Sequence, residues 1–136
     1  MAGLHSYIKL WKSNRDKSIE SEADIYDVMR YDYAFEKSAT PNGQVTDDTK
    51  GGVIQIETPV YPSDNVLAWV FDSIKRMDGE VMLCDGEMNM EHLVFEEARC
   101  IDFHFTYDEE QEESLMTHLT IHAMLLKVAD SSFTQL

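Results

Sequence analysis

Residues 61–79 read YPSDNVLAWVFDSIKRMDG, and they predict the amphipathic helix around which the rest of the chain is organised. Ser63 or Asp64 can cap this helix by accepting the unpaired amide hydrogens of its first turn. Gly79 can end it in the left-handed conformation that other residues avoid. We therefore expect one helix over about residues 64–77. At helical spacing its apolar face consists of Val66, Leu67, Val70, Phe71, Ile74 and Met77.

Trp69 lies on the flank of that apolar face and not at its centre. An aromatic residue in such a position is either a core-edge residue or a contact for another subunit, because aromatic residues are favoured at interfaces. The sequence leaves both readings open, so Trp69 is a candidate interface residue.

Every other long segment has the pattern of a β-strand, with side chains that alternate between two faces. The clearest alternation runs over residues 25–35, where the predicted inner face is aromatic. The pattern slips near residues 96–99, and a β-bulge there would explain the slip. We predict a mainly β fold, a two-sheet β-barrel or sandwich with one helix. Its strands are expected over residues 5–12, 25–35, 53–58, 80–85, 92–107 and 115–128.

Residues 38–52 form the longest stretch without an apolar pattern. They contain the strong turn signal Pro41-Asn42-Gly43 and end in Gly51-Gly52. A loop of this length inside a compact domain is usually functional or disordered. We expect an extended loop here.

The composition of the chain suits one domain, residues 1–136, because this length can bury a core but is short of two comfortable domains. Its 26 acidic and 11 basic residues give a formal net charge of −15. Such a chain should repel nucleic acid and anionic membrane surfaces, so basic partners are more plausible. The two cysteines, Cys84 and Cys100, favour buried thiols over a disulfide scaffold.

The N-terminal residues lack the charged and apolar regions of a signal peptide. No apolar run approaches the roughly 20 residues that a membrane-spanning helix needs. From these patterns we expect no direct membrane insertion, and a dedicated machine if the protein leaves the cell.

The sequence nominates no catalytic, cofactor-binding or metal site. His118 and His122 share a strand face, and a hairpin should bring His104 near Thr117 or His118. Histidines four residues apart on a strand are about 13 Å apart, too far to bind one zinc ion together. The acidic turn at residues 108–113 lacks the spacing of a calcium loop. Motifs for a nucleophile elbow or a phosphate cradle are absent, so we predict no enzyme and no cofactor.

The order of motifs resembles that of the haemolysin-coregulated proteins, the tube subunits of type VI secretion systems, in the form found in Bacteroidetes. The order and spacing of these motifs along residues 26–128 carry the resemblance. The motifs are YDV at 26–28, Tyr33-x-Phe35, GGVI at 51–54, LAWVFDS at 67–73, Asp78-Gly79, LVFEEARC at 93–100, and LTI at 119–121 with Lys127-Val128.

This resemblance implies a structural protein, a small β-barrel-like pair of sheets with one helix and no catalytic residues. Six copies would form a ring, and stacked rings would form a tube that a contractile sheath expels together with effectors. The implied partners are other copies of the chain, the sheath, spike and baseplate proteins, and effectors. The protein would be cytoplasmic before assembly and then secreted without a signal peptide. Two alternatives remain: a phage-like tail tube subunit, and a monomeric β-barrel binding module.

The long loop is the candidate contact between subunits or rings. A long loop on a β domain with unpaired edges would be protected by docking on a neighbour in a closed assembly. Residues 38–52 should therefore reach an adjacent ring or subunit. With Trp69, the candidate interface residues are Thr40, Pro41, Asn42, Gly43, Gln44, Asp47, Asp48 and Lys50.

Overall fold

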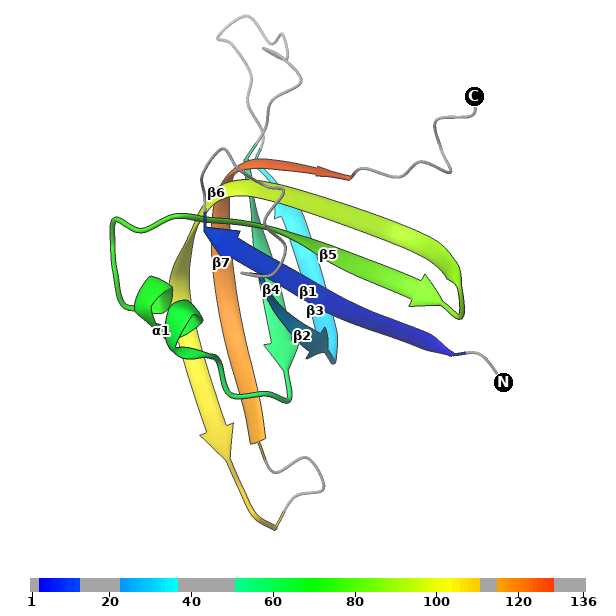
Figure 1. Ribbon diagram of the computed structural model, residues 1–136, viewed down its shortest axis with the longest axis horizontal. Helices are drawn as coiled ribbons and strands as arrows, with labels where there is room; N and C mark the ends of the chain where they lie inside the picture. The colour runs from blue at the N-terminus through cyan, green and yellow to red at the C-terminus, as the bar shows by residue number, and fades with distance from the viewer. Residues whose placement is uncertain (1–2, 13–22, 37–50, 111–114, 129–136) are drawn as a thin grey trace, which may run out of the picture.

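The computed structural model describes residues 3–12, 23–36, 51–110 and 115–128 (Figure 1). The described residues form seven strands and one short helix. In chain order these are β1 (Leu4–Lys12), β2 (Asp24–Val28), β3 (Arg30–Phe35), β4 (Gly52–Thr58), α1 (Asp64–Val70), β5 (Met77–Asp85), β6 (Met88–Tyr107) and β7 (Leu115–Val128).

The strands pair in the order β2-β1-β5-β6-β7-β4-β3, and every neighbouring pair is antiparallel. The expected mainly β fold with one helix is confirmed. We expected two separate sheets, but the strands form one continuous sheet. The long strands β6 and β7, of 20 and 14 residues, extend through both parts of it and join them. Figure 1 shows how strongly these two strands curve.

The sheet closes on itself at Met29. The strand expected over residues 25–35 is broken there, so that β2 and β3 lie at opposite ends of the strand order although they are consecutive in the chain. The backbone amide of Met29 donates to the carbonyl oxygen of Glu57 in β4, at 2.7 Å. A single residue therefore links the two ends of the rolled sheet.

The core lies inside this roll. Ile8, Val81 and Leu93 are cross-strand partners on β1, β5 and β6, and each is at most 1% exposed. Burial of such a side chain contributes about 1.5–3 kcal/mol to stability.

Ile54 and Ile56, which share one side of β4, are both fully buried. Alternation therefore separated the two faces of β4 correctly. The aromatic inner face predicted over residues 25–35 is only partly buried, because Tyr31 and Tyr33 pack against the core whereas Phe35 is 39% exposed.

The bulge predicted near residues 96–99 is confirmed. Ala98 pairs with Met77 and Phe95 pairs with Gly79, so two residues of β6 lie opposite the single residue Asp78 of β5. The second of them, Glu97, has the left-handed backbone angle φ 51°. The buried carboxylate of Asp78 accepts a hydrogen bond from the Glu97 amide at 2.8 Å, which satisfies a donor that the bulge removes from the ladder.

The helix is shorter than the sequence predicts. Ser63 caps it as expected, accepting from the amide of Val66 at 3.3 Å, but α1 ends at Val70 and not near residue 77. The carboxylate of Asp72 accepts from the amides of Ile74 and Lys75, and this local turn replaces the next helical turn. Met77 begins β5, so the strand expected from residue 80 starts three residues earlier.

Candidate functional site

The candidate interface residues predicted from the sequence divide into two groups. All eight loop residues, from Thr40 to Lys50, lie outside the described part of the chain. Trp69 is fully buried, and its indole Nε1 donates to the carbonyl oxygen of Ala98 at 2.9 Å. Trp69 is therefore a core residue that joins α1 to β6, and its buried side chain offers no surface to another subunit.

Hydrogen bonds join the described residues on either side of the predicted loop. Glu36 donates its amide to the carbonyl oxygen of Gly51 at 2.9 Å, and its carboxylate lies 2.8 Å from Nε2 of His122 on β7. A Cβ atom at Gly51 would lie 2.6 Å from the carbonyl oxygen of Ala123. Glycine is therefore needed at this point, where the chain passes close to β7.

The second half of β6 has an unpaired edge. β5 pairs with β6 only as far as Ala98, whereas β7 accompanies β6 to Tyr107. Among the described strands, none pairs with the other side of Arg99–Tyr107. Figure 1 shows this half of β6 as the yellow strand that runs past α1. An unpaired edge is a ready template for another chain.

A group of apolar side chains lies beside this edge, and we call it the aromatic surface. Phe71 and Ile74 are 74% and 79% exposed, although they belong to the apolar face predicted for the helix. The ring centroids of Phe71 and Phe103 are 5.9 Å apart, edge to face, and those of Tyr61 and Phe105 are 5.1 Å apart. Phe103 and Phe105 are two residues apart on β6 and share one side of the strand, so the two ring pairs are neighbours. Exposed apolar patches of this kind mark interaction sites.

The turn that presents Phe71 and Ile74 is held by its own hydrogen bonds. Asp72 accepts from the Ile74 amide at 2.8 Å, and the guanidinium of Arg76 donates to the Ile74 carbonyl oxygen at 2.7 Å. A preorganised turn loses little conformational freedom when a partner covers it, and this favours binding.

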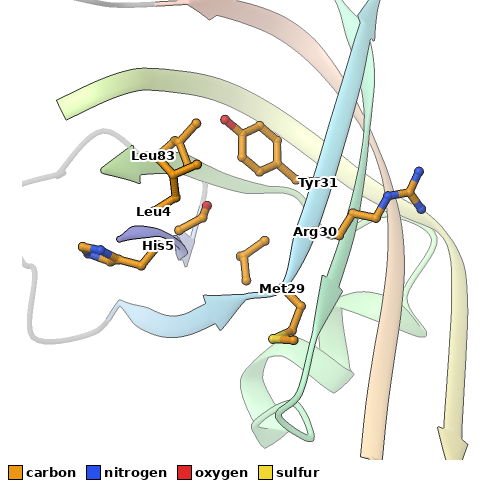
Figure 2. A pocket seen from close by; sticks show the side chains of 8 residues that line it. Leu4, His5, Met29, Arg30, Tyr31 and Leu83 are labelled. Carbon is orange, nitrogen blue, oxygen red and sulfur yellow. The ribbon is translucent and has the colours of Figure 1, made fainter. Parts of the chain in front are cut away.

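A cleft of about 290 Å³ lies at the mouth of the rolled sheet (Figure 2). It forms where the start of β1 meets the junction of β2 and β3. Leu4 and Met29, on its rim, are 66% and 50% exposed. The cleft is lined by Leu4, His5, Ser6, Val28, Met29, Arg30, Tyr31 and Leu83.

The wall of the cleft is fixed by a cluster that the sequence did not reveal. The phenols of Tyr31 and Tyr33 on β3 both donate to the carboxylate of Glu91 on β6, the second at 2.7 Å. Burial and then the bond to Glu91 raise the pKa of Tyr31 far above its ordinary value. The bond to Glu91 and then burial raise the pKa of Tyr33 to about 12. Glu91 therefore ties the end strand β3 to the opposite wall.

We expect Glu91→Gln to lower the pKa of both tyrosines. The amide carries no negative charge, and its NH₂ group cannot accept a phenolic hydrogen. A raised phenol pKa means that folding favours the neutral form. The stability that the raised pKa contributes to the folded state is fully present below the ordinary tyrosine pKa of about 10. It is lost as the pH rises toward about 12. The variant should thus be less stable at neutral pH, by about 1–2 kcal/mol, and its stability should depend less on alkaline pH.

Phenolate absorbance against pH, together with urea unfolding at neutral and alkaline pH, would measure both effects. Glu87→Gln, at an exposed position in the neighbouring turn, is the matched control and should leave the tyrosine titration unchanged. A Glu91→Gln titration that overlays that of the parent chain would contradict the assignment.

The expected juxtaposition of histidines is present on the outer face. His104 pairs directly with His118, and both line a shallow hollow of about 230 Å³ with Glu57, Thr106 and Met116. Within residues 3–12, 23–36, 51–110 and 115–128, no three His, Cys, Asp or Glu side chains are grouped so as to hold a metal ion.

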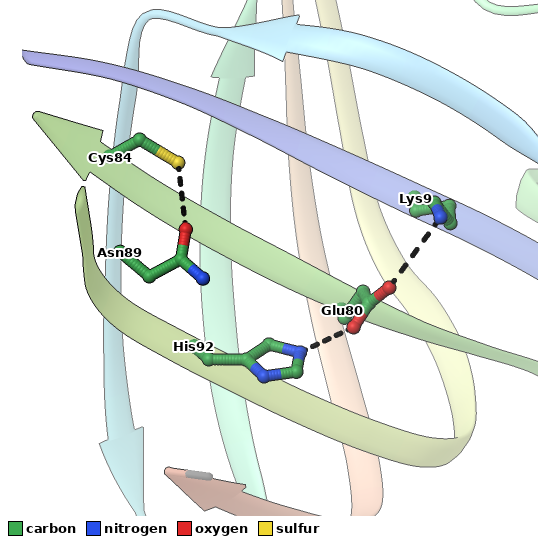
Figure 3. A network of polar contacts seen from close by, with 5 residues as sticks. All are labelled: Lys9, Glu80, Cys84, Asn89 and His92. Atoms are coloured by element: carbon green, nitrogen blue, oxygen red, sulfur yellow. Dashed lines mark hydrogen bonds and ion pairs between the residues drawn. The ribbon is translucent and has the colours of Figure 1, made fainter. Parts of the chain in front are cut away.

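Both cysteines are free thiols. Cys84 is buried and its Sγ lies 3.5 Å from Oδ1 of Asn89, while burial raises the pKa of the Cys100 thiol to about 11. A further polar contact joins Lys9 on β1, Glu80 on β5 and His92 on β6 (Figure 3). In the described part of the chain, no helix has the length and apolar character to span a membrane.

These features define a class of protein. A rolled antiparallel sheet, with an unpaired strand edge beside an exposed aromatic surface, is a β domain whose outside is suited to association. Comparison with known families is more specific. The family model of hemolysin coregulated protein Hcp (TssD) matches residues 5–135, so the chain belongs to that family of tube-forming proteins of contractile injection systems.

Solved structures share the fold. Hcp1 from Flavobacterium johnsoniae is 22% identical, with a TM-score of 0.63 over 90% of this chain and 94% of that one. Hcp1 from Salmonella typhimurium is 9% identical, with a TM-score of 0.59 over 89% of this chain and 81% of that one. A chain of the anti-feeding prophage baseplate is 10% identical, with a TM-score of 0.57 over 91% of each chain. No curated protein matches the sequence.

Proposed function

We propose that this chain is the subunit of the inner tube of a type VI secretion system. Six copies form a ring, rings stack into a tube, and the tube is expelled from the cytoplasm with effectors that travel in or on it. Its partners are other copies of the chain, the sheath, spike and baseplate proteins, and the effectors. The proposal assigns the chain no catalytic role.

The unpaired edge of β6 beside the aromatic surface is the observation that carries this proposal. An exposed apolar surface is a liability in a monomer, and a neighbouring subunit would remove it from water. A monomeric binding module could use the mouth cleft but would leave the aromatic surface exposed to water, so the observation favours association.

The net charge adds a condition to the assembly. Copies that each carry a formal charge of −15 repel one another, and salt screens this repulsion within a Debye length of about 10 Å at 0.1 M. Ring formation should therefore be favoured by moderate salt, whereas contacts that rest on opposite charges would weaken. The salt dependence reports which of the two effects dominates.

Deletion of residues 42–49, from the proposed ring-to-ring loop, is the experiment that tests the proposal. We expect the parent chain to form a discrete species near six chains, and stacks of that species in negative-stain images. The deletion variant should keep the ring mass and lose long stacks, because the loop is proposed to contact the next ring. Light scattering over a range of protein and salt concentrations gives the mass.

The two measurements test two parts of the proposal separately: ring formation and the role of the loop in stacking. A parent chain that is monomeric at every concentration would overturn the ring and favour the binding module. Unchanged stacks in the deletion variant would overturn the role of the loop alone. Circular dichroism of the variant controls for loss of the fold.

A further inference from the structure

We propose that neighbouring copies join head to tail, with the aromatic surface of one copy seated against the mouth cleft of the next. The inference rests on the proposed ring assembly and names the two surfaces that form its contact. It assigns the exposed Phe71 and Ile74 as the inserted side chains and the cleft between β1 and the β2–β3 junction as their receptor.

The two surfaces lie at opposite ends of the molecule. Figure 1 shows α1 at one end of the long axis and the start of β1 at the other. A contact between two different surfaces is heterologous, and it closes into a ring when the rotation between copies is suitable. Surfaces at opposite ends leave each copy free to contact one neighbour on either side.

The cleft has the size and chemistry to accept an aromatic or branched side chain. Its volume is about 290 Å³, and an apolar cavity of about 150 Å³ is already large enough for a benzene molecule. Val28 and Leu83 form an apolar part of the lining, while Leu4 and Met29 remain exposed on the rim. Covering this rim would remove a second exposed apolar area from water.

Besides the carboxylate of Asp72, which is bonded to the amides of its own turn, the aromatic surface carries basic side chains that complement the cleft. Lys75 and Arg76 directly follow Ile74 in a chain that has only 11 basic residues. The strands that border the cleft carry carboxylates, among them the exposed Asp27 on β2 and Asp32 on β3. Arg30, a basic residue of the cleft, already lies 3.3 Å from Glu57 and 3.7 Å from Asp32. A head-to-tail contact thus brings basic side chains to acidic ones.

The same charges argue against two aromatic surfaces facing each other. In a two-fold contact each surface meets its own copy, so the pair Lys75 and Arg76 would face another such pair across an apolar interface. Like charges at close range disfavour that arrangement. In the head-to-tail contact Lys75 and Arg76 instead meet the carboxylates that border the cleft, and the basic residue there, Arg30, is already paired with Glu57 and Asp32.

The unpaired strand edges fit the same arrangement. The outer edge of Arg99–Tyr107 lies beside the aromatic surface, and β2, at one end of the strand order, borders the cleft. Among the described strands, neither edge has a partner on that side. A contact that brings the two together could add backbone hydrogen bonds to the apolar burial.

A mixing experiment tests the inference. One variant carries Phe71→Asp and Ile74→Asp, and the other carries Leu4→Asp and Met29→Asp; all four positions are exposed, so each variant should fold. We expect each alone to lose association by about 100-fold or more, which is the loss of a strong hot spot. Mixed together, they should form a dimer of one copy of each and nothing larger, because one intact surface remains on each copy.

Light scattering and native mass spectrometry give the masses, and circular dichroism checks the fold. Met124→Asp, at a position 62% exposed on β7 and outside both surfaces, is the matched control and should assemble as the parent chain does. If the Leu4/Met29 variant alone still dimerises, the aromatic surface binds itself and the inference is wrong. Parent rings that neither variant disturbs overturn the contact alone, whereas a parent chain that never assembles overturns the proposed function.

Discussion

Trp69→Ala is expected to lower the free energy of unfolding by about 3–5 kcal/mol, among the largest losses that a single core substitution causes. The side chain of Trp69 is fully buried between α1 and the sheet. Removing the indole leaves a cavity and takes away the donor of the 2.9 Å hydrogen bond to the Ala98 carbonyl oxygen. Since that bond and the indole packing both join α1 to β6, the helix should lose its fixed position.

Urea unfolding followed by circular dichroism measures this effect. Phe71→Ala, two residues further along, is the matched control and should cost less than about 1 kcal/mol because its ring is 74% exposed. Trp69→Phe should fall between the two, since it keeps most of the volume and loses the hydrogen bond. Equal losses for Trp69→Ala and Phe71→Ala would contradict the assignment of Trp69 to the core.

The start of the helix could be predicted from the sequence, but its end could not. Ser63 caps α1 through a local hydrogen bond that residue spacing reveals. The apolar period continues through Phe71 and Ile74, however, and spacing cannot distinguish a residue that faces a core from one that faces a partner. The hydrogen bonds of Asp72 ended the helix, and those exposed residues became part of the aromatic surface.

Strands were predictable because alternation is local, whereas closure of the sheet was not. The aromatic alternation of residues 25–35 passes through Met29 without interruption. The break there arises because β2 pairs with β1 and β3 pairs with β4, at opposite ends of the sheet. The bulge near Glu97 could be predicted, since a two-for-one mismatch shifts the alternation itself.

The cleft and its wall depend on contacts between residues far apart in the chain. Glu91 lies 60 residues from Tyr31 and 58 from Tyr33, and no local pattern pairs a carboxylate with those phenols. The predicted loop contacts rest on the resemblance and on residues outside the described part of the chain. The candidate association surfaces could therefore be identified only from the structure, whereas the family could be recognised from the sequence.

Gly79→Val is expected to lower the free energy of unfolding by about 3 kcal/mol, the upper range for overpacking a core. The sequence placed Gly79 at the end of a helix, but it lies within β5, paired with Leu10 and Phe95. A Cβ atom there would lie 2.5 Å from the Lys9 carbonyl oxygen and 2.5 Å from Cζ of Phe95. Glycine is thus required because a backbone and a ring both occupy the space of a side chain.

A double variant shows which of the two obstacles matters more. Gly3→Val, where a Cβ atom meets nothing within 4 Å, is the control and should leave stability unchanged. If the ring is the main obstacle, Phe95→Leu should make Gly79→Ala less costly, and the two losses should be less than additive. If the Lys9 carbonyl oxygen is the main obstacle, the losses should add, because shortening the ring leaves the backbone contact in place. A Gly79→Val chain as stable as the Gly3→Val chain would contradict the close approach itself.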